Sequence, residues 1–268
     1  MKVLLIGCGN IGSALLKLWV DQGTCTSVVV VNPQLVDAEE FSSHTHVKFV
    51  ITFEQIPHDF VEDIVVIAVK PQNLDAVVTS LKDRANNALV VSVLAATKLQ
   101  RLHNLLPMHK NIIRVMPNIA IKTGNSINLT FADTGIQDAF IELFERLFGA
   151  TGDIIFLKHE LSIDMLTPVA GSGPAYFFLL ADLLYSEARK ISLNDIEAKK
   201  MIDRLFVGAA SMIQQDVQYE DMIKSVASKG GVTEAALNVM RTNMTDVLQR
   251  SLDSALVRLG EMSDESSH

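Results

Sequence analysis

A glycine-rich stretch near the N-terminus has a spacing that suits phosphate chemistry. Gly7, Gly9 and Gly12 form a G-x-G-x-x-G pattern directly after the apolar run Val3 to Ile6. In this pattern the first glycine permits a tight turn, the second lets the backbone approach a pyrophosphate, and the third allows close helix packing. The N-terminus of the helix that follows, residues 11–21, attracts the anion. The stretch therefore predicts dinucleotide binding, with a purely structural glycine turn as the alternative.

The same stretch also resembles the signal and cleavage site of an exported bacterial lipoprotein, because Lys2 precedes an apolar run that ends in Gly7-Cys8. A signal peptide carries an apolar region of about 7–15 residues before its cleavage site. Only Val3 to Ile6 lie between Lys2 and Gly7. Elsewhere charge, glycine or proline interrupts each long apolar run within the ~20 residues that a transmembrane helix needs. We therefore expect a cytoplasmic protein with no membrane partner.

The composition is that of an ordinary folded protein that acts on a small molecule. The 268 residues carry a net charge of -8, with 49% hydrophobic and 20% charged side chains. This acidic balance argues against broad binding to nucleic acid or to an anionic membrane. Cys8 and Cys25 form neither a CxxC pair nor a cluster with histidines at zinc-ligand spacing. We expect no metal site and no nucleic-acid partner.

The residue that follows the second predicted strand selects between dinucleotide cofactors. An NAD site usually places Asp or Glu there, about 20 residues past the glycines, to bind the ribose hydroxyls. Here the strand ends at Val31, and the uncharged Asn32 and Pro33 follow. Because no carboxylate at this position repels a 2'-phosphate, NADP(H) is favoured. Because no arginine follows to clamp that phosphate, NAD(H) stays possible.

Two further strand ends carry polar residues beside a proline. One strand ends in Ala68-Val69-Lys70-Pro71, and another ends in Arg114 to Asn118. The carboxyl ends of the strands line the ligand crevice of a doubly wound sheet. Lys70 could meet a phosphate or could simply precede a helix start. Asn118 could hydrogen-bond a cofactor amide or satisfy the turn after the proline.

Two glycine-containing stretches lie at predicted helix starts in the second half of the chain. They are Ala170 to Tyr176, which reads AGSGPAY, and Ser228 to Glu234, which reads SKGGVTE. The first N–H groups of a helix are unpaired unless an anion or a side chain accepts them. The second stretch could therefore bind a small carboxylate, with the Ser228 and Thr233 hydroxyls as extra donors. Both stretches are also ordinary capping sequences, with Thr233 as a suitable N-cap residue.

The elements that position these residues alternate between strand and helix in the first part of the chain. Continuous apolar strands that are covered by crossover helices are typical of a parallel sheet with helices on both faces. The predicted strands are 3–6, 27–31, 47–51, 64–69, 88–93, 111–115, 126–131 and 154–157. The predicted helices between them are 11–21, 34–41, 72–84, 98–106 and 137–148.

From Glu160 onward the pattern changes to helical. Apolar residues recur every three or four positions in 176–189, 195–215 and 234–259. A helix near 161–166 is expected to lead directly into this part, because no Pro/Gly/Ser-rich linker separates the two. The sequence thus predicts an α/β protein, with a doubly wound parallel sheet in residues 1–157 and an all-helical domain in residues 158–268.

Several motifs of other enzyme classes are absent from the sequence. It contains no G-x-S-x-G elbow, no H-E-x-x-H, no P-loop and no CxxC. Hydride transfer tolerates their absence, because the cofactor carries the chemistry and the protein mainly orients it.

Seven motifs occur in order along the chain: IGCGNIGSALL, AVKPQ, VVSVLAA, IIRVMPN, GSGPAYFF, GAASMI and SKGGVTEAAL. Together they resemble the pyrroline-5-carboxylate reductase family over nearly the whole length. The resemblance implies a Rossmann-like N-terminal domain and a C-terminal helical dimerisation domain that interleaves with a second subunit. It also implies a homodimer or a larger assembly of dimers, with the active site near the dimer interface. The implied reaction is the reduction of 1-pyrroline-5-carboxylate to L-proline by NADPH or NADH, the last step of proline biosynthesis.

The resemblance carries roles onto matching positions of this sequence. It assigns the pyrophosphate to a first set of residues: Gly7, Gly9, Asn10, Ile11 and Gly12. It assigns the adenosine ribose to Asn32 and Pro33, the cofactor crevice to Ala68, Lys70 and Pro71, and the nicotinamide end to Pro117 and Asn118. The substrate carboxylate would be received by Ser228, Gly230, Gly231, Val232 and Thr233. Thr233 matches the threonine thought to hydrogen-bond the imine nitrogen, with Asp216 as a weaker alternative donor.

Two departures from the family pattern bear on the substrate. Lys229 replaces the proline of the usual S-P-G-G-T-T, which removes a fixed φ and adds a positive charge. Ile119 replaces the threonine of the usual M-P-N-T-P. The alternatives are therefore a reductase of a related cyclic imino acid, such as a piperideine carboxylate, and a non-catalytic NADP-binding regulatory protein.

Overall fold

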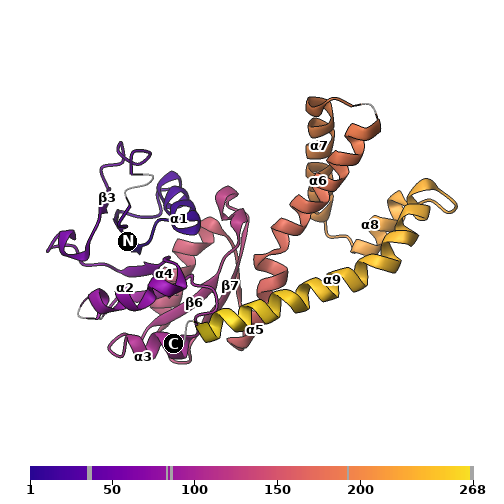
Figure 1. Cartoon of the computed structure of the whole chain (residues 1–268). Helices are drawn as coiled ribbons and strands as arrows, with labels where there is room; N and C mark the ends of the chain where they lie inside the picture. The colour runs from indigo at the N-terminus through magenta and orange to yellow at the C-terminus, as the bar shows by residue number, and fades with distance from the viewer. Residues whose placement is uncertain (35–37, 83, 85–86, 192, 266–268) are drawn as a thin grey trace. The chain divides into compact units, whose positions relative to one another are not determined.

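The computed structural model describes residues 1–34, 38–82, 84, 87–191 and 193–265 (Figure 1). Its internal contacts divide the chain into two units. The first unit comprises Met1–Ser172 together with the chain from Leu256 onward, and the second comprises Gly173–Ala255. Residues 158–172, which the sequence assigns to the helical part, therefore group with the sheet.

The first unit is built on an eight-stranded sheet with the order β3-β2-β1-β4-β5-β6-β7-β8. The strands are β1 (Lys2–Ile6), β2 (Ser27–Val31), β3 (Val47–Val50), β4 (Ile64–Ile67), β5 (Leu89–Ser92), β6 (Ile112–Met116), β7 (Ser126–Ala132) and β8 (Gly152–Phe156). The first six follow the order of a doubly wound dinucleotide-binding sheet. Each predicted strand is present, which confirms the predicted α/β fold class.

One pairing differs from the prediction of a fully parallel sheet. β7 runs antiparallel to β6, with Ile113 opposite Ala132 and Met116 opposite Leu129, whereas the other described pairs are parallel. The connection between these two strands is residues 117–125, which include the 3-10 turn η3 (Ile119–Thr123) and Gly124, with a φ of 71°. A parallel pair needs a crossover of a dozen or more residues, so this short connection dictates the reversal.

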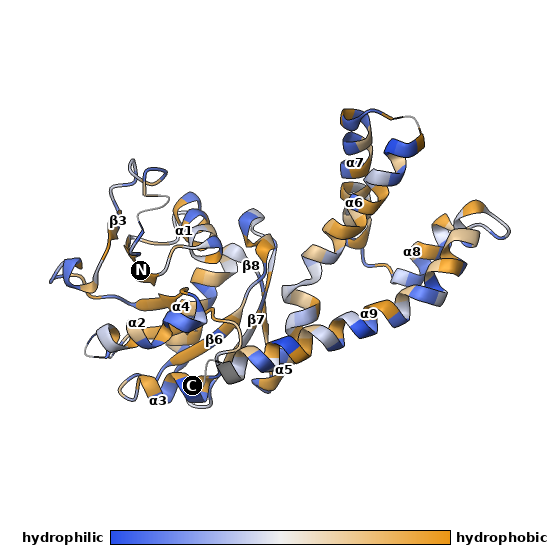
Figure 2. Cartoon of the chain, in the orientation of Figure 1, coloured by the Kyte–Doolittle hydropathy of each residue, from blue (hydrophilic) through white to orange (hydrophobic). Residues whose placement is uncertain are grey.

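The sheet is covered by helices on both faces. The helices of this unit are α1 (Asn10–Asp21), α2 (Leu74–Leu81), α3 (Leu99–Leu105), α4 (Asp138–Phe148) and α5 (Leu161–Leu166), with short turns η1 (Phe53–Gln55), η2 (Pro71–Asn73), η4 (Gly149–Thr151) and η5 (Thr167–Gly171). In β1, Val3 and Leu5 pack with α1 and α4, whereas Leu4 and Ile6 pack with α2 and α3. Figure 2 shows the resulting apolar strands. Burial on both faces explains why the strands read as continuous apolar runs.

Trp19 fixes the helix that carries the glycine-rich turn. Its side chain is fully buried, and its Nε1–H donates to the carbonyl oxygen of Leu147 at 3.1 Å. Its ring meets that of Phe148 edge to face, with the centroids 6.3 Å apart. The C-terminal half of α1 is therefore anchored on α4.

The predicted helix 34–41 is wrong where the structure describes it. Residues 38–41 form turns, with i to i+3 bonds from Ser42 N–H to Glu39 O and from His44 N–H to Phe41 O, and residues 35–37 lie outside the described residues. Of residues 38–41 only Phe41 is buried, so the segment has no apolar stripe to hold a helix on the sheet.

A buried arginine joins the sheet to α5. Arg114 lies on β6 between the apolar residues Ile113 and Val115, and only 1% of its side chain is exposed. Its guanidinium donates to Glu160 at 3.0 Å and to Asp164 of α5. The Glu160 carboxylate also accepts the Leu99 N–H at the start of α3. These bonds fix the chain just before it enters the second unit.

We expect Arg114→Met to lower the free energy of unfolding by about 3–5 kcal/mol, because the change leaves two partly buried carboxylates without their cation. Urea unfolding of the purified protein measures this loss. The control is Lys199→Met, which breaks the exposed Lys199–Asp203 ion pair and should cost less than about 1 kcal/mol. Equal losses in the two variants would contradict the assignment.

The second unit is helical. It contains α6 (Gly173–Ile191), α7 (Asp195–Ile213), α8 (Tyr219–Val226) and most of α9 (Val232–Glu265). α6 packs on α7, and α7 begins with a capping box formed by Asn194 and Glu197. The sequence did not predict α8. Among the described residues, the helices that reach the length of a bilayer span are too polar to serve as one.

The helices of the second unit leave much apolar surface uncovered. Phe177, Phe178 and Leu183 on α6 expose 60%, 65% and 55% of their surfaces. Buried apolar residues in the described part of α6 and α7 are Ala188, Ala198 and Ile202. A set of helices with so small a core needs another surface to pack against.

Candidate functional site

The turn after β1 is held closely against the ends of β2 and β4. The Gly7 N–H donates to the Val31 carbonyl at 2.9 Å, which fixes the turn against the end of β2. Gly7 has a φ of 94°, and a Cβ there would lie 2.7 Å from the Ala68 carbonyl oxygen. Only glycine fits this conformation and this close approach to β4.

The other two glycines divide the tasks that the sequence predicts. A Cβ on Gly12 would lie 2.3 Å from the Gly7 carbonyl oxygen, so Gly12 lets α1 pack directly on the turn. A Cβ on Gly9 would meet no heavy atom of the described chain within 4 Å. Gly9 is also the N-cap residue of α1, and it has no side chain that could accept a hydrogen bond from the first N–H groups of the helix. The helix N-terminus therefore faces open space, as a bound pyrophosphate requires.

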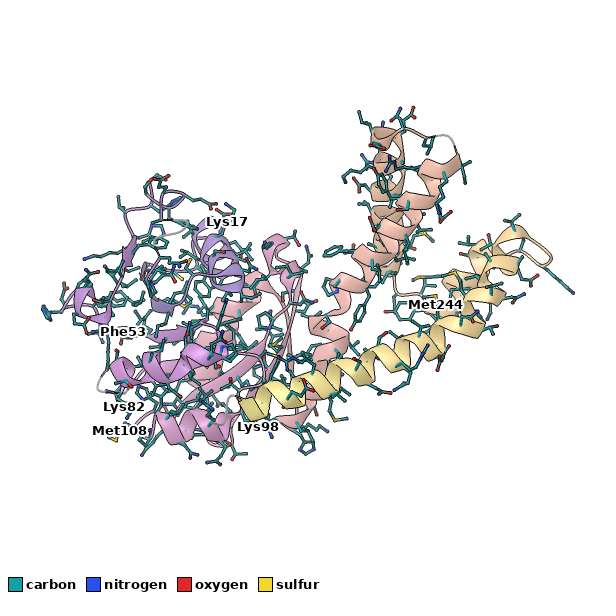
Figure 3. All side chains as sticks on the ribbon, in the orientation of Figure 1. Lys17, Phe53, Lys82, Lys98, Met108 and Met244 are labelled. Atoms are coloured by element: carbon teal, nitrogen blue, oxygen red, sulfur yellow. The ribbon has the colours of Figure 1, made fainter. Side chains whose placement is uncertain are left out.

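A cavity of about 760 Å³ opens at this turn. Its wall includes Gly7, Cys8 and Gly9 of the turn, and Asn32, Pro33 and Gln34 after β2. It continues over Thr52, Phe53 and Glu54 after β3, and over Ala68, Val69 and Lys70 after β4. Figure 3 labels Phe53 on its loop. The carboxyl ends of four neighbouring strands thus line one cavity, which is the usual ligand position in a doubly wound sheet.

The cavity wall carries one cation and one acid among its described residues. Lys70 is exposed, and Pro71 follows it at the start of η2. Glu54 is exposed on η1. The Thr52 hydroxyl and the Glu54 backbone N–H hold the pKa of the Glu54 carboxyl below its ordinary value. Glu54 is therefore ionised at neutral pH.

Asn32 braces the glycine-rich turn. Its Oδ1 accepts the Cys8 N–H at 3.3 Å, its backbone N–H donates to the Val50 carbonyl at 2.9 Å, and its Nδ2 donates to the Gln34 carbonyl. The side chain therefore has a structural bond to the turn in addition to its place in the cavity wall.

Several predicted cofactor residues lie outside the cavity wall. Asn10, Ile11 and Gly12 form the first turn of α1 behind Gly9, and Pro71 lies next to Lys70. Pro117 and Asn118 follow β6 and are buried. The Asn118 side chain accepts the Ala120 N–H at 3.0 Å and donates to the Ala170 carbonyl at 2.9 Å. The bond to Ala120 satisfies the turn after the proline, which is one of the two roles that the sequence left open, and the bond to Ala170 ties this turn to η5.

The predicted carboxylate-binding stretch forms a tight turn at the start of α9. Gly230 has a φ of 74°, and the Gly231 N–H donates to the Ser228 carbonyl at 2.9 Å. A Cβ on Gly231 would lie 2.5 Å from the Ser228 Oγ. Both glycines are therefore required by the turn itself. This turn lies in the second unit, whereas the cavity lies in the first.

Thr233 lies in the first turn of α9, which begins at Val232, and its side chain is half-buried. Thr233 is therefore the second residue of the helix and not its N-cap residue, which was the structural alternative in the sequence. The neighbouring Glu234, which the sequence analysis did not single out, takes part in the turn: its carboxylate accepts the Gly230 N–H at 2.7 Å. The acid four residues after Gly230 was a visible signal for this bond.

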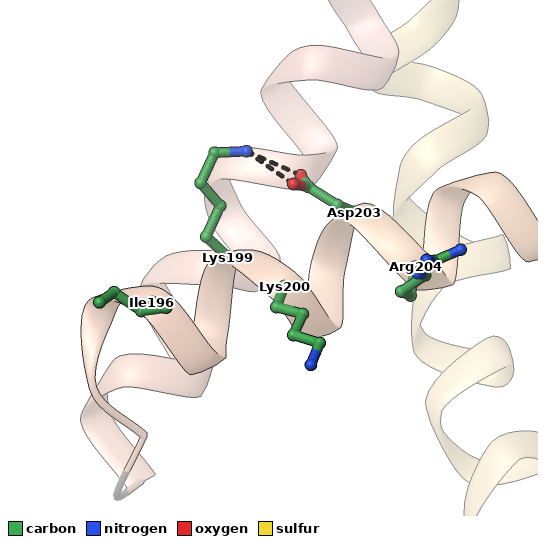
Figure 4. A pocket seen from close by; sticks show the side chains of 5 residues that line it. All are labelled: Ile196, Lys199, Lys200, Asp203 and Arg204. Carbon is green, nitrogen blue, oxygen red and sulfur yellow. Dashed lines mark hydrogen bonds and ion pairs between the residues drawn. The ribbon is translucent and has the colours of Figure 1, made fainter.

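A shallow hollow on α7 is not a catalytic site. Figure 4 shows its residues on one helix, with the Lys199 Nζ bonded to the Asp203 carboxylate at 2.7 and 3.0 Å. Its wall consists of Ile196, Lys199, Lys200, Asp203 and Arg204. Side chains from a single helix, without an opposing wall, provide nothing to orient a ligand. Within the described ranges, no three His, Cys, Asp or Glu side chains gather as a metal site would require.

Two family models match separate parts of the chain. Residues 160–262 match the family model described as pyrroline-5-carboxylate reductase dimerisation. Residues 2–96 match the model described as NADP oxidoreductase, coenzyme F420-dependent. The first match covers the helical unit, and the second covers the glycine-rich turn and the cavity.

Individual relatives match two thirds of the chain or more. A pyrroline-5-carboxylate reductase of Synechocystis is 34% identical over 181 residues, which are 67% of each chain. One from Haemophilus influenzae is 27% identical over 264 residues, or 97% of each chain.

Solved structures are similar over the full length. A pyrroline-5-carboxylate reductase of Coxiella burnetii has a TM-score of 0.87 at 26% identity, covering 97% of this chain and 98% of its own. A Plasmodium falciparum pyrroline carboxylate reductase, solved with NADP bound, has a TM-score of 0.84 at 21% identity, covering 98% of each chain. At that identity the second similarity supports the fold alone.

Proposed function

Because the chain belongs to the pyrroline-5-carboxylate reductase family, we propose that it reduces the cyclic imine 1-pyrroline-5-carboxylate to L-proline with NADPH. The reaction is an oxidoreduction at a C=N bond and forms the last step of proline biosynthesis. Relatives that match along almost the whole length of the chain support this activity over a function limited to one domain.

The observation that carries the proposal is the open space over Gly9, at the uncapped start of α1 and at the mouth of the cavity. A volume of about 760 Å³ lies within the range of small-molecule sites, ~300–1,000 Å³. The turn, the helix N-terminus and Lys70 provide groups that attract phosphates. The residues present therefore fit a dinucleotide, and bound NADPH would supply the hydride.

We propose the following roles for the chain's own residues. Gly7, Gly9 and the α1 N-terminus at Asn10, Ile11 and Gly12 hold the pyrophosphate, and Asn32 and Pro33 hold the adenosine ribose. Ala68, Lys70 and Pro71 form the crevice, and Pro117 and Asn118 support its nicotinamide end. The Asn118 role is indirect, because its amide already bonds to Ala120 and Ala170.

The turn at the start of α9 is the proposed substrate site. Ser228, Gly230, Gly231 and Val232 would receive the substrate carboxylate, and the Thr233 hydroxyl would orient the imine nitrogen. A cyclic imine is basic enough to be partly protonated near neutrality, so the enzyme needs no strong acid of its own. Holding the imine carbon about 3–3.5 Å from the hydride then provides most of the acceleration.

We further propose that the functional unit is a homodimer or a larger assembly of dimers. The match to a dimerisation region supports an oligomer, and so does the apolar surface of α6, where Phe177 and Phe178 are largely exposed. In this view residues 1–157 form the dinucleotide-binding domain, and residues 158–268 form the helical dimerisation and substrate domain. The cytoplasm is the proposed location.

The test is the oxidation of NADPH by purified protein, followed at 340 nm with and without pyrroline-5-carboxylate. We expect oxidation that depends on the imine and yields L-proline. A clear preference for the six-membered piperideine carboxylate, in steady-state rates, would favour the related-imine alternative raised by Lys229 and Ile119. NADPH binding without any imine-dependent oxidation would favour the non-catalytic alternative.

A further inference from the structure

The acid that the sequence lacks after β2 is present in the turn η1, which follows the neighbouring strand β3. A dinucleotide site usually binds the adenosine ribose hydroxyls with a carboxylate about 20 residues past the glycines, and Asn32 occupies that position here. The structure adds Glu54 to the wall of the same cavity. A carboxylate in this wall favours a free 2'-hydroxyl and disfavours a 2'-phosphate.

The pairing of β2 with β3 places Glu54 beside the ribose end of the cavity. Val31 is opposite Val50, and the Asn32 N–H donates to the Val50 carbonyl at 2.9 Å, so the two strands end side by side. The Ile51 N–H donates to the Gln55 Oε1 at 2.9 Å, which turns η1 back onto the strand end. Asn32 and Gln34 after β2, and Thr52 and Glu54 after β3, all line the cavity.

The cation of the cavity lies on the opposite side. Lys70 follows β4, and the strand order β3-β2-β1-β4 puts two strands between it and the loop that carries Glu54. Three strand spacings amount to about 14 Å. Lys70 therefore follows a strand whose backbone lies about 14 Å from that of β3, on the far side of the glycine-rich turn that is proposed to hold the pyrophosphate.

We propose that Glu54 is a specificity-determining residue, whose carboxylate weakens the binding of a cofactor that carries a 2'-phosphate and thereby allows the protein to use NADH beside NADPH. This inference rests on the proposed function, because it requires a dinucleotide in the cavity. What Glu54 changes is the ratio between the affinity for NADPH and the affinity for NADH.

The experiment measures the Kd of NADPH and of NADH by the nicotinamide fluorescence of cofactor bound to the full-length protein without substrate. In Glu54→Gln we expect the Kd of NADPH to fall by roughly three- to tenfold, the size of one carboxylate–phosphate repulsion near a surface, and the Kd of NADH to stay within about twofold. Glu54→Lys should enlarge this difference. Because the effect is electrostatic, it should shrink at high ionic strength.

The matched control is Asp59→Asn, which removes the same charge from an exposed position that does not line the cavity. It should leave both Kd values unchanged. An unchanged NADPH-to-NADH ratio in Glu54→Gln, or an equal change in Asp59→Asn, overturns the inference. Failure of the wild type to bind either cofactor overturns both this inference and the proposed function. Binding with the expected ratio but without imine reduction overturns the proposed reaction alone.

Discussion

Replacing Gly9 with alanine should weaken NADPH binding by at least about tenfold while changing the free energy of unfolding by less than about 1 kcal/mol. The added methyl group meets no other heavy atom of the described chain within 4 Å, so the folded structure does not have to change to accommodate it. It would instead occupy the space over the start of α1 that the pyrophosphate needs. Cofactor titration and urea unfolding of the same preparation measure the two effects.

Gly12→Ala provides the contrast, because its methyl group would lie 2.3 Å from the Gly7 carbonyl oxygen. The turn has to move, so both the stability and the cofactor affinity should fall, the stability by about 1–3 kcal/mol. Gly149→Ala is the neutral control, since its added Cβ also meets nothing and it lies at the end of α4. If Gly9→Ala unfolds the protein as much as Gly12→Ala does, the open space over Gly9 is not a ligand site.

These opposite expectations for two glycines of one motif show what the sequence contains and what it omits. The spacing of Gly7, Gly9 and Gly12 predicts the turn, and the structure confirms its geometry. The same spacing predicts that Gly12 serves the packing of the helix whereas Gly9 leaves room for a ligand. It does not give the contact that makes an added methyl group costly at Gly12, which is the close approach of the Gly7 carbonyl to α1.

Most of the sheet was predictable, because strands buried on both faces read as short continuous apolar runs. The reversal of β7 was missed, since an apolar run carries no information about its direction. The length of the connection after Met116 was the available signal, because it is too short for a crossover. The turn at residues 38–41 was mistaken for a helix because its spacing suggested a stripe, although only Phe41 is buried.

Two acids escaped prediction for the same physical reason. Glu54 joins the cavity through the pairing of β3 with β2, and Glu234 joins the substrate turn by reaching back to the Gly230 N–H. Charged residues on exposed turns are common, so neither stands out by type. The spacing of Glu234 from Gly230 was a local signal, whereas Glu54 becomes informative only when the pairing of β3 with β2 brings it to the cavity.

The largest expected effect on catalysis concerns Thr233. Thr233→Ala should lower the turnover of pyrroline-5-carboxylate on the order of a hundredfold, the usual size of a lost hydrogen-bonding group at a reacting atom. The loss of stability should stay below about 1 kcal/mol, because Thr233 lies within the first turn of α9 and not at its N-cap position. Steady-state kinetics with saturating NADPH measure the first effect, and thermal unfolding measures the second.

Thr242→Ala is the matched control on the same helix. The Thr242 hydroxyl donates to the Asn238 carbonyl at 2.9 Å on an exposed face, so its removal tests the loss of a helical threonine without a substrate role. Thr233→Ser keeps the hydroxyl and should restore most of the turnover, which a purely structural role for the methyl group would not allow. Parallel losses of turnover and stability in Thr233→Ala would instead identify a residue that only holds the helix start. The imine nitrogen would then need another partner, and Asp216 would be the next residue to replace.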